Sequence, residues 1–92
     1  MSKDEQLDPK MIHLANYPSR KLILQKLKSG PTDMAKLQKA AKMNQKVFES
    51  HLGQLRDADL VKVDKDSVSI TGKGKEILAY VEKLDMENID WT

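Results

Sequence analysis

The spacing of apolar residues changes from a helical to a strand-like period within residues 44–70, and this change restricts the folds open to the chain. Phe48, Leu52 and Leu55 recur at the spacing of one helix face, which predicts a buried stripe. Beyond this helix, apolar and polar residues alternate on both sides of a Lys65–Asp66 tip, a pattern typical of a β-hairpin. A lone hairpin is only marginally stable in water, so its valine face must pack against helices.

Helices are predicted on both sides of the hairpin. Apolar stripes and capping residues place them over residues 8–17, 19–29, 33–42, 44–58 and 72–86. The residues that stand at helix starts as caps are Ser19, Thr32 or Asp33, Asn44 and Thr71. Gly30 and Pro31 end the helix 19–29, because glycine readily adopts the left-handed conformation and proline cannot continue a helix. The helices 33–42 and 44–58, joined by a tight turn, make a helix-turn-helix arrangement.

The fold class is therefore mainly α with a small β-hairpin (α+β), and from residue 19 on the order is helix, helix, helix, hairpin, helix. Ninety-two residues make one small domain. We expect residues 1–18 to form a flexible or partly helical N-terminal extension, residues 19–86 the folded domain and residues 87–92 a C-terminal tail.

Composition removes several classes of function. The chain has no cysteine, which excludes disulfides, thiolate metal sites and a cysteine nucleophile, and two histidines alone make a poor zinc site. No serine stands in a recognisable motif with a histidine and an acid, so we expect neither an enzyme nor a cofactor. No apolar run approaches the roughly 18 residues of a membrane span, and the polar first residues do not form a signal peptide. We therefore expect a cytoplasmic protein without membrane contact.

Charge is distributed unevenly along the chain, although the net charge is only +2. The segment from Arg20 to Lys46 holds eight basic residues and one acid, a balance of +7. The segment from Glu76 to the end holds five acids and one lysine, a balance of −4. This asymmetry favours a polyanionic partner for the basic part. The alternative is two solvated helix faces of opposite sign that pair with each other.

Four motifs between Ser19 and Leu84 resemble those of the archaeal-type winged helix-turn-helix domains, a branch of the winged-helix superfamily. They are Leu27 with Gly30-Pro31 (L-x-x-G-P), Leu37 with Ala41, Met43 and Asn44, His51-Leu52 with Leu55 and Asp59-Leu60-Val61 (Y-L-x-x-L-x-x-x-G-L-I), and Ile70-Thr71 with Gly74-Lys75 (L-T-x-x-G-K). The sequence departs from the family pattern at three positions. Lys36 replaces a glutamate that completes a capping box, His51 replaces an aromatic residue, and Asp59 replaces a glycine. Aspartate tolerates the left-handed conformation better than most residues, so the turn at Asp59 can survive.

The resemblance implies a DNA-binding domain, a transcriptional regulator that inserts the helix 44–58 into the major groove and uses the hairpin 61–70 as its wing. When the resemblance is transferred to this chain, the residues that it implies as base contacts are Gln45, Lys46, Glu49, Ser50 and Gln54. Gln45 suits adenine, Lys46 suits guanine, and Glu49 either accepts from a cytosine amine or repels phosphates. The candidate phosphate contacts are Lys36, Lys39, Lys42, Lys62 and Lys65.

Two other functions stay open. One is a winged-helix module that docks other proteins within a larger complex. The charges of the helix 44–58 favour it, because Lys46 and Arg56 are balanced by the acidic Glu49 and Asp57. The wing tip also lacks arginine. The other is non-specific coating of DNA, which the low net charge disfavours.

The last helix carries a wide apolar stripe, made of Ile77, Leu78, Val81 and Leu84. If this stripe pairs with a second copy, two recognition helices can lie about 34 Å apart, one turn of DNA. Alternatively, the stripe covers the chain's own first helix. The partners expected are double-stranded DNA and a second copy, with no small-molecule ligand.

Two residues of the helix 44–58 have competing explanations. Gly53 either allows close approach to DNA or is a tolerated helix glycine that costs about 1 kcal/mol. His51 is either a pH sensor or ligand, or a packed substitute for an aromatic residue.

Overall fold

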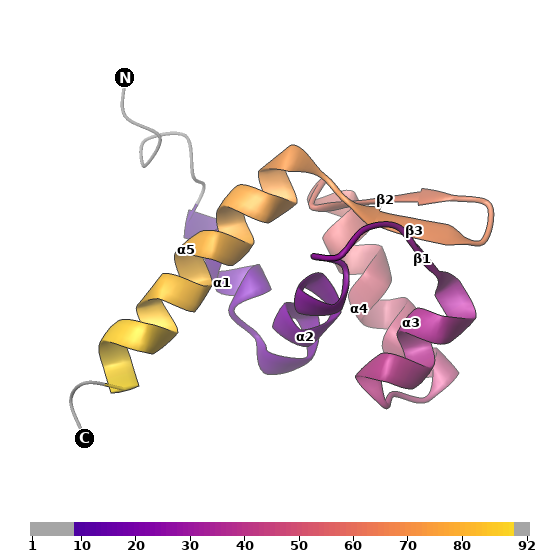
Figure 1. The fold of residues 1–92 in the computed structure, drawn as a ribbon, viewed down its shortest axis with the longest axis horizontal. Coiled ribbons are helices and arrows are strands. Elements are labelled where there is room, and N and C mark those ends of the chain that lie inside the picture. Colours follow the sequence, from indigo (N-terminus) through magenta and orange to yellow (C-terminus); the bar gives the residue numbers. More distant parts are fainter. Residues whose placement is uncertain (1–8, 90–92) are drawn as a thin grey trace.

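The computed structural model describes residues 9–89, with side chains to residue 84. Its elements are α1 (Pro9–Ala15), α2 (Pro18–Lys26), β1 (Thr32–Asp33), α3 (Met34–Ala41), α4 (Gln45–Asp57), β2 (Val61–Asp64), β3 (Ser67–Ile70) and α5 (Gly72–Ile89). The mainly helical order with one hairpin is confirmed (Figure 1). Helix α5 ends at Ile89, three residues beyond the predicted end, and the predictions for residues 1–8 and 90–92 fall outside the described residues.

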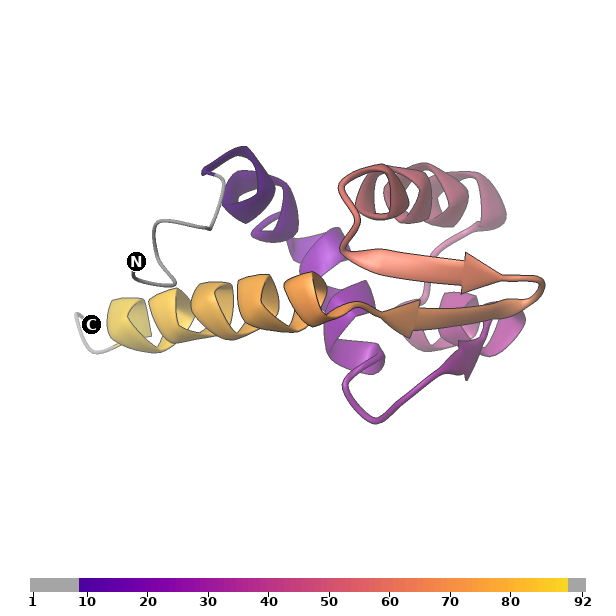
Figure 2. The same ribbon diagram turned by 90° about the horizontal axis from the view of Figure 1, so that it is seen from above.

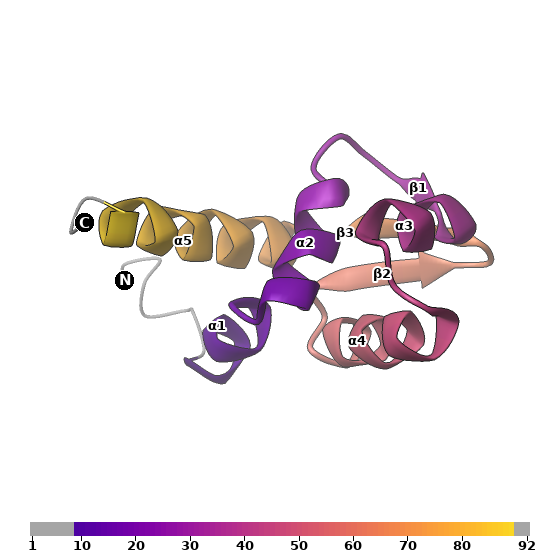
Figure 3. The ribbon, with the colours of Figure 1, turned by 90° about the horizontal axis from the view of Figure 1, so that it is seen from below.

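Two opposite ends of the molecule carry different elements. Figures 2 and 3 show α5 extending in one direction and the β2–β3 hairpin in the opposite one. Helix α4 runs alongside β2, and α1 lies beside α5. Helix α2 contacts α3, α4 and α5, so it is the central support of the fold.

Helix α2 begins and ends earlier than the sequence predicts. Pro18 occupies its first turn and Tyr17 is the N-cap residue, without a side-chain capping hydrogen bond. The predicted cap, Ser19, lies inside the helix, because proline is pre-organised for the first helical position and has no N–H that needs a partner there. The helix ends at Lys26, and the turn that follows closes at Gly30, whose φ of +129° suits glycine.

The helix-turn-helix forms with the predicted caps. The Asp33 carboxylate accepts from the backbone N–H groups of Ala35 and Lys36 at the start of α3. The Asn44 side chain accepts from the N–H of Val47, at 2.9 Å, at the start of α4. Between the two helices, Lys42 takes the left-handed conformation, with φ 55°.

The sheet has three antiparallel strands in the order β1-β3-β2. Val61 pairs with Ile70 and Val63 with Val68, which confirms the predicted hairpin. The sequence does not predict strand β1, because its two residues are too few to show an alternating pattern. It pairs Thr32 with Val68, beside the predicted start of α3.

The core lies where the five helices and the hairpin meet. Its buried members are Ala15, Ile23, Leu24, Leu27, Leu37, Ala41, Phe48, Leu52, Leu55, Leu60, Val61, Val68, Ile77, Leu78 and Val81. Three of the four residues predicted for dimerisation, Ile77, Leu78 and Val81, are therefore buried by the chain's own helices, and Leu84 is half-buried. These three side chains therefore follow the alternative prediction, in which the stripe packs within the same molecule.

The end of α4, the hairpin and the start of α5 are joined at one point. Asp59 takes φ 64°, as expected for the residue that replaces glycine. The Thr71 hydroxyl donates to the Asp59 carbonyl, at 2.7 Å, and accepts from the N–H of Gly74, at 2.9 Å, which confirms Thr71 as a cap. A Cβ at Gly74 would overlap the Leu60 carbonyl oxygen, so only glycine fits against this turn.

We expect Gly74→Ala to lower the free energy of unfolding by about 1–3 kcal/mol, because the new methyl group forces the joint apart. Gly72→Ala is the matched control, since a Cβ at Gly72 meets nothing within 4 Å. Urea unfolding of both variants measures the difference. Equal stability of the two variants would contradict the close approach at Gly74.

Candidate nucleic-acid interface

Helix α4 buries one face and leaves the opposite face to solvent. Phe48, Leu52 and Leu55 are at most 5% exposed and hold the helix on the core. Lys46 and Ser50 lie opposite this stripe and are exposed. Both belong to the predicted base contacts, so the structure leaves their side chains accessible to a partner.

The next turn of the same face has no side chain at Gly53. A Cβ built there meets nothing within 4 Å, and the φ of Gly53 is not positive. Within the part of the chain that the structure describes, neither packing nor backbone conformation therefore requires glycine at this position.

Gln45 and Glu49 lie together on one flank of α4. The Gln45 amide donates to the Glu49 carboxylate at 3.1 Å, and both side chains are exposed. They line a shallow hollow together with Asp33, at the start of α3, and Asp66, at the hairpin tip. Three carboxylates thus surround this hollow, so two of the predicted base contacts lie in a locally acidic part of the surface.

The opposite flank of α4 is held by a cluster that the sequence did not predict. The Arg20 Nε donates to the His51 Nδ1 at 3.3 Å, and its Nη1 donates to the Leu14 carbonyl at 3.2 Å. The Arg20 guanidinium lies 4.8 Å from the centre of the Tyr17 ring, and the Tyr17 and His51 rings are 5.5 Å apart. This cluster connects α1 and α2 to α4. His51 therefore packs as an aromatic residue. In the described part of the chain, no group of His, Asp and Glu residues can hold a metal ion.

The cluster lowers the pKa of His51 below its ordinary value of 6.5. Burial disfavours the charged ring, and the positive Arg20 guanidinium adds to this effect. Because His51 Nδ1 accepts from Arg20, the neutral ring carries its proton on Nε2, and protonation of Nδ1 would remove the acceptor.

We expect His51 to make the protein less stable in mild acid. Its pKa in the folded state lies below 6.5, so the unfolded chain binds the proton first as the pH falls. The contribution of neutral His51 to the free energy of unfolding is complete above pH 6.5, and it is lost as the pH drops through the folded-state pKa. His51→Phe keeps a ring in the cluster and removes this part of the pH dependence of the free energy of unfolding. His13→Phe, at an exposed position, is the control and leaves the contribution of His51 unchanged. Urea unfolding at pH 7.5 and pH 5 tests this, and an unchanged pH dependence in His51→Phe would contradict it.

The predicted phosphate contacts are all exposed and lie on the helix before α4 and on the hairpin after it. Lys36, Lys39 and Lys42 belong to α3 and the turn after it, and Lys62 and Lys65 belong to β2 and the hairpin tip. Within residues 9–84, no carboxylate pairs with any of these five ammonium groups. Their charge is therefore available to an anionic partner.

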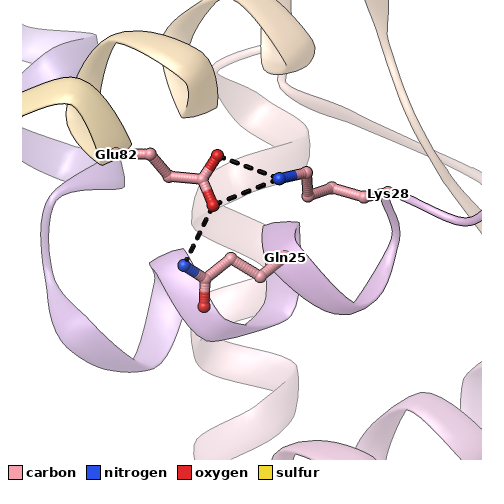
Figure 4. A network of polar contacts seen from close by, with 3 residues as sticks. All are labelled: Gln25, Lys28 and Glu82. Atoms are coloured by element: carbon pink, nitrogen blue, oxygen red, sulfur yellow. Dashed lines mark hydrogen bonds and ion pairs between the residues drawn. The ribbon is translucent and has the colours of Figure 1, made fainter. Parts of the chain in front are cut away.

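Lys28, in the basic segment, pairs with the acidic last helix. Lys28 contacts both carboxylate oxygens of Glu82, at 3.1 and 3.3 Å, and Gln25 donates to the same carboxylate at 3.2 Å (Figure 4). This contact links α2 to α5 on the side away from the hairpin. The pairing of opposite charges that the sequence left open is thus realised at this position.

The chain belongs to the winged helix-turn-helix family, because the model of that family matches residues 21–88. Comparison with curated protein sequences gives no match. No helix of the described residues is long and apolar enough to cross a membrane.

Two solved structures share the fold over nearly the whole of both chains. The transcriptional repressor BigR from Xylella fastidiosa is similar with a TM-score of 0.67 and 17% identity, over 91% of this chain and 93% of that one. NolR from Sinorhizobium fredii is similar with the same TM-score and coverage, at 20% identity. At these identities the likeness shows the fold.

The same fold also occurs as part of a longer chain. N,N-8-amino-8-demethyl-D-riboflavin dimethyltransferase (RosA) from Streptomyces davawensis is similar with a TM-score of 0.58 and 20% identity. The similarity covers 80% of this chain but only 24% of the methyltransferase chain.

Proposed function

We propose that this protein is a DNA-binding transcriptional regulator that inserts α4 into the major groove and uses the β2–β3 hairpin as its wing. The observation that carries the proposal is the set of exposed lysines on α3, the turn after it and the hairpin, none of which pairs with a carboxylate within residues 9–84. Phosphates on both walls of a groove need such charges. The similarity to the repressor BigR supports the same function.

The candidate contacts divide into three groups under this proposal. Lys46 and Ser50 point outward and are the main base contacts, with Gln54 half-buried beside them. Gln45 and Glu49 already bond to each other and read bases only as a pair. The lysines Lys36, Lys39, Lys42, Lys62 and Lys65 contact phosphates and set affinity and register.

We expect binding to random-sequence duplex DNA that weakens several-fold or more between about 50 and 200 mM salt, because released counterions drive it. Fluorescence anisotropy of labelled duplex measures this. Lys39→Ala, Lys42→Ala and Lys65→Ala each lower the slope of log affinity against log salt by about 1. Lys83→Ala, on the part of α5 away from the hairpin, is the control and leaves the slope unchanged. Absence of binding at low salt and high micromolar protein would overturn the proposal.

We expect Gly53→Ala to separate stability from binding. The variant gains about 1 kcal/mol of stability, because alanine is the better helix former and its methyl group meets open space. Its affinity for DNA falls if the duplex approaches this turn closely. Thermal unfolding and anisotropy give the two results, and a more stable variant with undiminished affinity would show that Gly53 is only a tolerated helix glycine.

We also propose that the regulator acts as a homodimer through α5. With Ile77, Leu78 and Val81 inside the chain's own core, the apolar surface for this contact comes from the half-buried Leu84 and from neighbouring α1. Two copies so paired can place their α4 helices about 34 Å apart on DNA. Sedimentation that shows a monomer at tens of micromolar protein would remove this proposal.

A second candidate function is a docking module for other proteins. The observation that favours it is the acidic hollow of Asp33, Glu49 and Asp66, which repels phosphates next to α4. The methyltransferase similarity, which covers a quarter of that chain, agrees with use of this fold inside larger proteins.

The archaeal-type branch, the cytoplasmic location, and the expected lack of enzymatic activity, cofactor and small-molecule ligand stay predictions from the sequence.

A further inference from the structure

Val47 is an exposed apolar side chain on the helix proposed to enter DNA. Within residues 9–84, Tyr17 and Val47 are the large hydrophobic side chains that are exposed, at 50% and 40%. Tyr17 contacts Arg20 and His51, whereas the solvent-facing part of Val47 has no such explanation. Val47 is not among the base contacts that the sequence predicts.

The position of Val47 on α4 is next to the outward-facing polar residues. It precedes Ser50 by three residues and Gln54 by seven, so the three side chains form one stripe along the helix. Lys46 precedes it directly and is exposed. Val47 therefore belongs to the surface that faces a partner, in the first turn of the helix.

The side chain of Val47 is held in place before any partner binds. Its backbone N–H donates to the Asn44 cap at 2.9 Å, which fixes the first turn. A β-branched side chain in a helix has one strongly preferred χ1 rotamer, so little side-chain entropy is lost when it makes a contact.

We propose that Val47 contacts the C5-methyl group of a thymine and so makes the protein prefer thymine at one position of its site. This inference rests on the proposed function. The thymine methyl is the apolar group that base edges present in the major groove. One valine among Lys46, Ser50 and Gln54 is too small an apolar area for a protein interface, whereas the neighbouring lysine charges suit a polyanion.

The test begins with selection of the preferred duplex from a random pool. Each thymine of that duplex is then replaced in turn by deoxyuridine, which lacks only the methyl group, and affinity is measured by anisotropy. We expect the replacement to lower the affinity about fourfold at one position in the site of each bound copy, which is the effect of one buried methyl group. Val47→Ala binds the thymine and deoxyuridine duplexes equally at that position.

Ser50→Ala is the matched control, because it changes the same stripe one turn further along. Its affinity for both duplexes changes, but the ratio between thymine and deoxyuridine at the identified position stays at the wild-type value. Thermal unfolding shows that both variants fold. The folding of Val47→Ala is expected to be intact, because alanine favours helix and the replaced side chain is exposed.

Two results would overturn the inference while leaving DNA binding intact. Either no thymine position discriminates against deoxyuridine, or Val47→Ala keeps the wild-type ratio. A failure of the proposed function looks different, since random duplex then fails to bind at low salt and no site is selected.

Discussion

The burial of Phe48, Leu52 and Leu55 determines which face of α4 is available to a partner. These three side chains place the helix against α2 and β2, and each is at most 5% exposed. Their removal from water stabilises the fold and also fixes the rotation of the helix about its axis. Lys46, Val47 and Ser50 face outward as a consequence of this packing.

Polar contacts fix the same helix at its two ends and along one flank. The Asn44 side chain caps its start, and the Thr71 hydroxyl bonds to the carbonyl of Asp59 just after its end. On the flank, Arg20 joins His51 to the α1–α2 region. Because Thr71 also caps α5, one side chain connects the ends of α4 and the hairpin to the last helix. The recognition helix, the wing and α5 are therefore positioned together.

Local rules predict most of this fold from the sequence. The stripe of α4, the caps Asp33, Asn44 and Thr71, and the alternation of the hairpin depend on neighbours within a few residues, so their patterns are visible. Strand β1 and the contact of Arg20 with His51, 31 residues apart, depend on the tertiary fold and leave no local pattern. For the same reason, the apolar stripe of α5 does not reveal whether it covers its own chain or a second copy.

Amide chemical shifts during a titration with duplex DNA at low salt test the central claim most directly. The account predicts that the largest changes occur in α4, along α3 and the turn after it, and in the hairpin at Lys62 and Lys65, with Lys46, Val47 and Ser50 among them. The middle of α5 between Ile77 and Val81 is expected to change little. Changes concentrated in α1 and α5, or none at all at high micromolar DNA, would contradict the account and leave α4 as a surface for a protein partner.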